Sequence, residues 1–347
     1  MNTINVGISK TKKFKRLLYI DIFRGFSLLV MAWIHIFNAL WVSNIYLTSP
    51  YYVKSINSIT WIPPSILFTF VSGMSVFLLV KKRLFLKKPK LGTVLEIIKR
   101  YGIYVLISLP LTTIMWGINT YLRWDEAIQG IGFTAIITAI FIVLFLEKKY
   151  FKKAALILIF LCAGLQHYLL HIFNIYRINI SVLNIILNIF FRGWFSVINL
   201  LPFMLGGILF FQFIQKKHYK KLFLYGLSFA ALSIIFHFYV IRINYYQRSL
   251  SLTFLGITES IILFSVLYAI YQKLRKDSIV SRFLEVYGKS AFFVYVFHLL
   301  VIVKVLEITG LGSHLSAGYS WLITVPLLVL IYYPARMYLK KHKKHLI

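Results

Sequence analysis

The chain has 347 residues, of which 60% are hydrophobic and only 14% are charged, and its formal net charge is +30. A soluble domain has about half of its residues apolar and about a quarter charged. The composition therefore excludes an ordinary soluble domain and predicts an all-α, polytopic bundle of membrane helices. The single cysteine, Cys162, excludes a disulfide framework or a cysteine-based metal site within the chain.

About ten apolar segments are long enough to cross a lipid bilayer as helices. We expect one integral-membrane domain over 1–347, with short basic tails at 1–16 and 336–347. The expected segments are 17–41, 60–80, 101–118, 127–146, 154–172, 195–214, 222–241, 251–271, 287–306 and 318–335.

The basic residues alternate between the two sides of these segments. Loops and tails expected on one side hold 30 of the 39 Lys and Arg residues, whereas loops on the other side hold six; the remaining three, Arg24, Lys289 and Lys304, fall within segments. Cytoplasmic loops are enriched in Lys and Arg, so the pattern predicts a cell-membrane protein with both termini in the cytoplasm. This topology explains the net charge without nucleic-acid binding, for which no motif is present.

Three ionisable residues, Asp21, Arg24 and His35, interrupt the first segment. Asp21 and Arg24 are three residues apart, so they share a helix face and can pair. Arg24 and His35 are eleven residues apart, about three turns and roughly 16 Å along the same face. Ionisable groups in a spanning helix normally face a bundle interior or a cavity and mark a functional site. The alternative is an arginine at a helix end and a histidine bonded to a neighbouring helix.

A polar group, Arg123, Trp124, Asp125 and Glu126, precedes the fourth segment. Carboxylates are favoured at a helix N-terminus and tryptophan anchors helices at the membrane surface, so a structural role explains the group. An acceptor site at the outer mouth of the bundle explains it equally well. Glu259, inside the eighth segment, is a further candidate for binding the acceptor.

Two histidines, His167 and His171, are four residues apart in the fifth segment. Histidines at this spacing can share a metal ion. No third ligand is adjacent, and a zinc site needs at least three protein ligands. We therefore expect no metal site.

The ninth segment carries another histidine, His298, at a depth similar to that expected for His35. Tyr295 lies three residues before His298 on the same face, and Lys289 lies at the cytoplasmic end of the segment. Two histidines in apolar surroundings suggest a cavity that handles protons or transfers acyl groups.

Four stretches, in this order, resemble motifs of the transmembrane acyltransferase superfamily, which includes the acyltransferase-3 and heparan-alpha-glucosaminide N-acetyltransferase catalytic-domain families. The spacing of Arg24 and His35 is similar to the acyltransferase-3 signature. The stretches are YIDIFRGFSLLVMAWIH, PPSILFTFVSGMSVFL, RWDEAIQGIGFTAIITAIF and GKSAFFVYVFH.

The resemblance implies a ten-helix core that transfers an acyl group, with acetyl as the expected one, from acyl-CoA to a hydroxyl or amine of a glycan or other cell-envelope acceptor. Acyl-CoA (acetyl-CoA) is then a co-substrate, and no permanently bound cofactor is expected. The glucosaminide branch uses a histidine in its first extracytoplasmic loop, but residues 42–59 contain none. This departure favours His35 as the general base.

The remaining candidate residues take supporting roles in this hypothesis. Asp21, Arg24 and Lys289 bind the donor or order its cavity, and His298 and Asp125 orient the acceptor or stabilise charge. Arg123, Trp124, Glu126 and Glu259 bind the acceptor.

Two other classes of function remain open. A proton-coupled transporter or flippase could use the same polar stripe, although no inverted repeat is visible. A non-catalytic scaffold would have little reason to bury Asp21, Arg24, His35 and His298.

Overall fold

The computed structural model describes residues 16–41, 64–117, 126–172, 182–192, 195–239, 250–273, 278–312 and 314–342. Within these ranges the chain is helical and forms no β-strand, which confirms the all-α prediction. The elements are α1 (Leu18–Leu40), α3 (Pro64–Phe85), α4 (Lys90–Trp116), α6 (Ala127–Phe145), α7 (Phe151–Ile172), α8 (Val182–Leu187), η2 (Asn188–Arg192), α9 (Val197–Gln215), α10 (Tyr219–Tyr239), α11 (Leu250–Lys273), α12 (Ile279–Lys289), α13 (Ala291–Phe297), η3 (His298–Val303), α14 (Lys304–Ile308) and α15 (Ala317–Lys341).

Eight stretches of helix in the described part of the chain are long and apolar enough to cross a membrane, judged by length and composition. They lie in α1, α3, α6, α9, α10, α11, the continuous run α13–η3–α14, and α15. The other two expected segments are also helical, as α4 and α7, but both helices begin among basic residues, which lowers their hydropathy. The protein is therefore a multi-pass helical bundle.

Several helices extend beyond the expected segments, but the ninth segment begins later than expected. The sequence predicts that the ninth segment begins at residue 287, but α12 ends at Lys289 and the apolar helix begins at Ala291. α12 has apolar residues on one face and polar residues on the other, and such a helix suits the surface of a bilayer better than its interior. Lys289 consequently lies outside the membrane-spanning helices.

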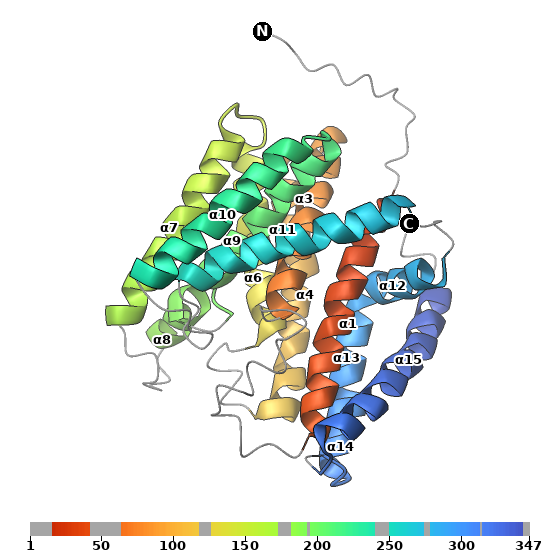
Figure 1. Cartoon of the computed structure of the whole chain (residues 1–347). Helices are drawn as coiled ribbons and strands as arrows, with labels where there is room; N and C mark the ends of the chain where they lie inside the picture. The colour runs from red at the N-terminus through yellow and green to blue at the C-terminus, as the bar shows by residue number, and fades with distance from the viewer. Residues whose placement is uncertain are drawn as a thin grey trace.

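Helix α1 occupies a central position in the bundle (Figure 1). It packs against α3 on one side and against α12, α13, η3 and α15 on the other. The larger of two hydrophobic clusters surrounds α3 and α9 and includes Phe70, Phe203 and Phe210, each almost fully buried. The second cluster joins α1 to η3 and α15 through Leu28, Ile36 and Leu299 among others. Helix α1 thus contributes to both clusters.

Two glycines allow α1 and α12 to cross at backbone contact. A methyl group added at Gly25 would lie 1.9 Å from the Leu284 carbonyl oxygen, and one added at Gly288 would lie 1.8 Å from that of Asp21. Any side chain at either position would push the helices apart, which is why glycine is needed here. The close crossing places the start of α1 against the end of α12.

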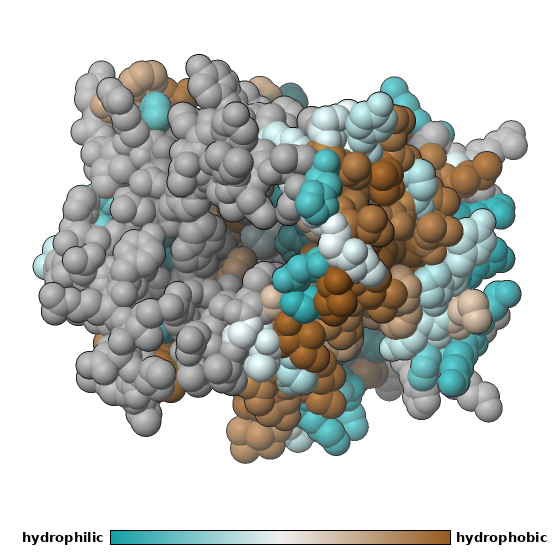
Figure 2. Space-filling model, turned by 90° about the horizontal axis from the view of Figure 1, so that it is seen from below, coloured by the Kyte–Doolittle hydropathy of each residue, from teal (hydrophilic) through white to brown (hydrophobic). Residues whose placement is uncertain are grey.

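The outer surface of the bundle is strongly apolar. Figure 2 views the molecule from the end at which α14 lies, and hydrophobic residues form a large continuous area of the coloured surface in that view. Leu106 in α4, Phe238 in α10 and Leu322 in α15 are each about 70% exposed or more. Exposed apolar area on this scale suits lipid contact and not water, so the faces of the bundle fit a bilayer environment.

Candidate functional site

A cavity of about 1660 Å³ opens at the end of the bundle where α1 begins and α15 ends. We call the part of the cavity at this opening the basic end. The cavity lies between α1, α3, α4, the α12–α13 region and α15, and its volume exceeds the roughly 300–1,000 Å³ of a typical small-ligand pocket. Among the described residues that line it, Asp21 is the one acid, and nine are basic: Arg16, Arg24, Lys81, Lys82, Arg83, Arg100, Lys289, Arg336 and Lys340. The charge of this cavity suits a large polyanionic ligand.

The cavity changes character with depth. Its lining extends from the basic residues to Met31 on α1, Ile128 and Ile131 on α6, and Tyr295 on α13. We call Met31, Ile128 and Tyr295 the apolar end of the cavity. A ligand with an anionic head and a less polar arm matches this change of lining.

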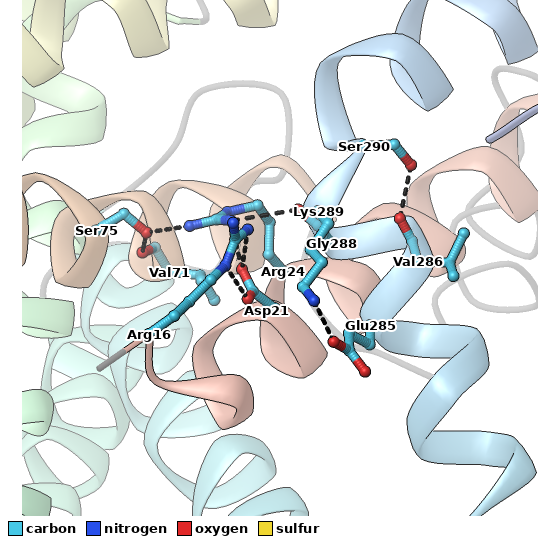
Figure 3. A network of polar contacts seen from close by, with 10 residues as sticks. All are labelled: Arg16, Asp21, Arg24, Val71, Ser75, Glu285, Val286, Gly288, Lys289 and Ser290. Carbon is cyan, nitrogen blue, oxygen red and sulfur yellow. Dashed lines mark hydrogen bonds and ion pairs between the residues drawn. The ribbon is translucent and has the colours of Figure 1, made fainter. Parts of the chain in front are cut away.

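Asp21 lies at the centre of an ion network at the basic end (Figure 3). It is 3% exposed, and Arg16 binds both of its oxygens, with Nε to Oδ2 at 2.6 Å and an Nη to Oδ1 at 3.0 Å. Arg24 Nη1 also donates to Oδ1 at 3.0 Å. Two guanidinium groups on one carboxylate leave one net positive charge, so the network remains attractive to an anion.

Arg24 joins three helices through its other hydrogen bonds (Figure 3). Nη1 also donates to the Gly288 carbonyl of α12 at 3.2 Å, and Nη2 donates to Ser75 Oγ of α3 at 2.5 Å. Ser75 in turn donates to the Val71 carbonyl at 3.0 Å. A guanidinium has five N–H groups in a fixed plane, and these bonds occupy three of them. The geometry therefore supports the second of the two roles expected for Arg24, that of ordering the cavity.

Lys289 lines the cavity from the end of α12 and pairs with Glu285 one turn earlier. Its side chain is about a third exposed, so the ammonium keeps contact with the cavity while paired. An exposed pair of this kind adds little stability. The position of Lys289 suits an interaction with a ligand in the cavity.

His35 and His298 form a hydrogen-bonded pair. His35 Nδ1 and His298 Nε2 are 2.9 Å apart, and the ring planes are inclined by 11° with centroids 5.2 Å apart. The rings therefore meet edge to edge. His298 is fully buried, whereas His35 is half-buried. The two residues expected at similar depth are thus in direct contact.

The second bond of His298 determines the protonation pattern of the pair. His298 Nδ1 lies 3.0 Å from the Val294 carbonyl oxygen, which only accepts, so Nδ1 carries the proton. In the neutral ring Nε2 then accepts, so His35 Nδ1 must donate to it. This leaves the lone pair of the neutral His35 on Nε2, the atom that can take a proton from another group.

A π-helical stretch positions His298. η3 begins at this residue and interrupts an otherwise continuous helix from Ala291 to Ile308. Single π-turns inside α-helices are uncommon and occur frequently at functional sites. His298 is thus the first residue of the π-helical stretch, and its ring bonds back to the Val294 carbonyl in the preceding α-helical turn.

Tyr295 and Glu126 form a second buried pair beside the histidines. The Tyr295 hydroxyl donates to Glu126 Oε1 at 2.5 Å, and the Tyr295 ring meets that of His298 edge-on with centroids 5.4 Å apart. Glu126 caps α6 by accepting from the backbone N–H groups of Ile128 at 2.6 Å and Gln129 at 3.1 Å. The helix-capping role that the sequence indicated for Glu126 is confirmed.

Of the other candidate residues, Glu259 falls within the part of the chain that the structure describes. Arg123, Trp124 and Asp125 lie outside the described residues. Glu259 lies in α11 and is not part of the cavity lining. No group of three or more His, Cys, Asp or Glu side chains that could hold a metal occurs in the described ranges.

Three contributors to the site do not emerge from the sequence pattern. Arg16 falls in the expected basic tail, and Ser75 falls within the stretch PPSILFTFVSGMSVFL without being a candidate itself. Tyr295 stands out in the sequence only because it shares a helix face with His298. Arg16 precedes α1, so helical spacing gives no signal for its pairing with Asp21. The Ser75 and Tyr295 contacts join residues 51 and 169 positions apart. For Tyr295, its position one turn before His298 is the available signal.

Comparison of the chain with protein-family models and with curated proteins finds no match.

Proposed function

We propose that this protein is an integral-membrane acyltransferase. It takes an acyl group from acyl-CoA in the basic cavity and passes it to a hydroxyl or amine of a glycan or other cell-envelope acceptor. The observation that carries the proposal is a chain of contacts. A cavity lined by nine basic residues reaches Tyr295, the Tyr295 ring contacts His298, and His298 is hydrogen-bonded to His35. Neither histidine is among the residues that line the cavity, so in this proposal the thioester lies where Tyr295 borders the cavity, beside the histidine pair.

The donor suits the cavity in charge and in the change of its lining. Coenzyme A has phosphate groups at one end and a flexible, mostly uncharged arm that ends in the thioester. The basic end would hold the phosphates by charge-assisted hydrogen bonds, and the arm would extend toward Met31 and Tyr295. Arg24 and His35 lie roughly 16 Å apart along α1, a separation that an extended arm of this kind spans.

The histidine pair supplies the base. His35 Nε2 would take the proton of the acceptor while its oxygen or nitrogen attacks the thioester carbonyl. His298 holds His35 in the tautomer that leaves Nε2 unprotonated. His298 therefore acts as a positioning residue in this mechanism, and His35 as the catalytic base.

The direct test uses purified full-length protein in lipid nanodiscs, with radiolabelled acetyl-CoA and a membrane glycan extract. We expect labelled acceptor to form and free CoA to be released in equal amounts. A protein that moves the glycan across the membrane without consuming acetyl-CoA would instead be the transporter or flippase.

The orientation proposed here has both termini and the cavity mouth in the cytoplasm, because basic residues are concentrated at that end. Single-cysteine variants at Lys149, just before α7, and at Leu311, just after α14, test it, because the two positions are expected on opposite sides of the membrane. An impermeant thiol reagent applied to intact cells should label position 311 and not position 149. Labelling of position 149 alone would invert the topology.

A further inference from the structure

The transfer step needs a hydrogen-bond donor for the oxygen of the thioester carbonyl. When the acceptor attacks, negative charge develops on that oxygen, and a positioned donor stabilises it. The donor must lie at the apolar end of the cavity, close to the base. Of the three residues that define that end, Met31, Ile128 and Tyr295, Tyr295 has the polar side chain.

Tyr295 also meets the requirement of closeness to the base. Its ring contacts that of His298 edge-on, and His298 is bonded to His35. It is 6% exposed, and it is held by one hydrogen bond to a carboxyl group that is itself anchored by two backbone N–H groups. The hydroxyl is therefore fixed in position in the absence of a ligand.

We propose that Tyr295 donates the hydrogen bond that stabilises the thioester oxyanion, and that Glu126 is the residue that positions it. This inference rests on the proposed acyl transfer and names a catalytic group within it. A tyrosine hydroxyl has one proton and two lone pairs. In the structure that proton is donated to Glu126 Oε1. The proposed role requires Glu126 to be protonated on Oε1, so that its O–H donates to the Tyr295 oxygen and the Tyr295 proton turns to the thioester oxygen.

The step balances in atoms and electrons. His35 Nε2 takes the proton from the acceptor hydroxyl, the acceptor oxygen bonds to the thioester carbon, and the carbonyl electron pair moves onto oxygen beside the Tyr295 O–H. The carbonyl then re-forms, the carbon–sulfur bond breaks, and the departing thiolate takes the proton from His35. Tyr295 and Glu126 keep their protons throughout, because they act only through hydrogen bonds.

The main experiment compares wild-type protein with Tyr295→Phe, using acetyl-CoA and the membrane glycan extract. Removing an oxyanion donor typically lowers kcat by about 10²–10³-fold, and we expect this loss while the KM for acetyl-CoA changes little. Tyr287→Phe is the matched control. Tyr287 is also buried and donates to a backbone carbonyl, that of Leu328, but it is not among the residues that line the cavity.

Glu126 provides a second comparison that does not depend on Tyr295→Phe folding. Glu126→Gln keeps a carbonyl oxygen for the two cap bonds and places an amide N–H beside the Tyr295 oxygen. Glu126→Ala removes both the oxygen that accepts the cap bonds and the group that bonds to the Tyr295 oxygen. At equal amounts of folded protein, Glu126→Gln should retain about tenfold more kcat than Glu126→Ala, as expected for the loss of one hydrogen bond.

The outcomes separate this inference from the proposed function. Wild-type kcat in Tyr295→Phe, or equal losses in the two Glu126 variants, would overturn the role of Tyr295 while acyl transfer stands. A loss in Tyr287→Phe as large as that in Tyr295→Phe would also overturn it. Failure of the wild-type protein to consume acetyl-CoA would overturn the proposed function itself.

Discussion

The two polar networks of the bundle differ in charge and in how they are held. The network at the basic end places one carboxylate, Asp21, between Arg16 and Arg24, and connects α1, α3 and α12. The second network pairs His35 with His298 and Tyr295 with Glu126. His35 lies fourteen residues beyond Asp21, roughly 21 Å further along α1. The ion pairs thus lie near one end of the spanning helix, and the imidazoles lie deeper.

The difference follows from the cost of charge in a membrane. An ionised group becomes more expensive toward the bilayer centre, and near the ends of a helix it can reach the interface. Charged arginines can therefore be accommodated at the basic end. A group that must gain and lose a proton deeper in the membrane should be an imidazole, because an imidazole can be neutral near pH 7. We expect the basic end to govern donor binding and stability, and the histidine pair to govern turnover.

His35→Ala should have the largest effect. Loss of a general base lowers the rate by typically about 10²–10⁴-fold, and acyl-CoA binding should be retained because an imidazole at this depth does not reach the phosphates. Turnover with acetyl-CoA and binding by calorimetry check the two parts. Full turnover in this variant would remove the proposed base.

Removal of both arginines from Asp21 should have the next largest effect. Arg16→Ala with Arg24→Ala leaves a buried carboxylate without a partner, and such losses destabilise by about 3–5 kcal/mol. Arg24→Ala alone should destabilise less, by about 1.5–3 kcal/mol, the value of hydrogen bonds to a charged group, because Arg16 still binds both oxygens. Unfolding experiments in detergent measure the loss of stability in the single and the double variant. An equal loss in the single and double variants would show that Arg16 contributes nothing.

Gly288→Ala should disturb the basic end through the backbone. The added methyl group would lie 1.8 Å from the Asp21 carbonyl oxygen, and overpacking of this kind costs about 1–3 kcal/mol. We also expect weaker acyl-CoA binding, because the Gly288 carbonyl bonded to Arg24 must move. Gly164→Ala in α7 is the control, since its methyl group meets no atom within 4 Å. Equal stability of the two variants would contradict the close crossing.

Lys289→Ala should have the smallest effect, an increase of a few-fold in the KM for acetyl-CoA, as expected for the loss of one partly exposed charge near an anion. Lys304→Ala is a matched control, because Lys304 pairs with Glu307 as Lys289 pairs with Glu285 but is not part of the cavity lining. Steady-state kinetics at low ionic strength measure the KM for acetyl-CoA of the two variants. Equal KM values for the two variants would mean that the phosphates of acetyl-CoA bind away from Lys289.

The helices and their faces can be predicted from the sequence because both depend on local pattern. Apolar runs give the spanning segments, and helical spacing alone places Asp21, Arg24 and His35 on one face. The cap at Glu126 follows in the same way, since a carboxylate at a helix start bonds the first N–H groups. The α12 boundary is misplaced because apolar residues lie on both sides of Gly288 and Lys289, and no proline separates the two helices.

The contacts between helices were decided by tertiary structure alone. Residues at similar depth on two helices can face each other or lie apart, and the crossing geometry determines which occurs. Here Gly25 and Gly288 allow backbone contact between α1 and α12, which brings the Gly288 carbonyl to Arg24. The hydrogen bond between His35 and His298, and that between Tyr295 and Glu126, likewise join residues more than 150 positions apart. Helical periodicity carries no information about such pairs, because it describes one helix at a time.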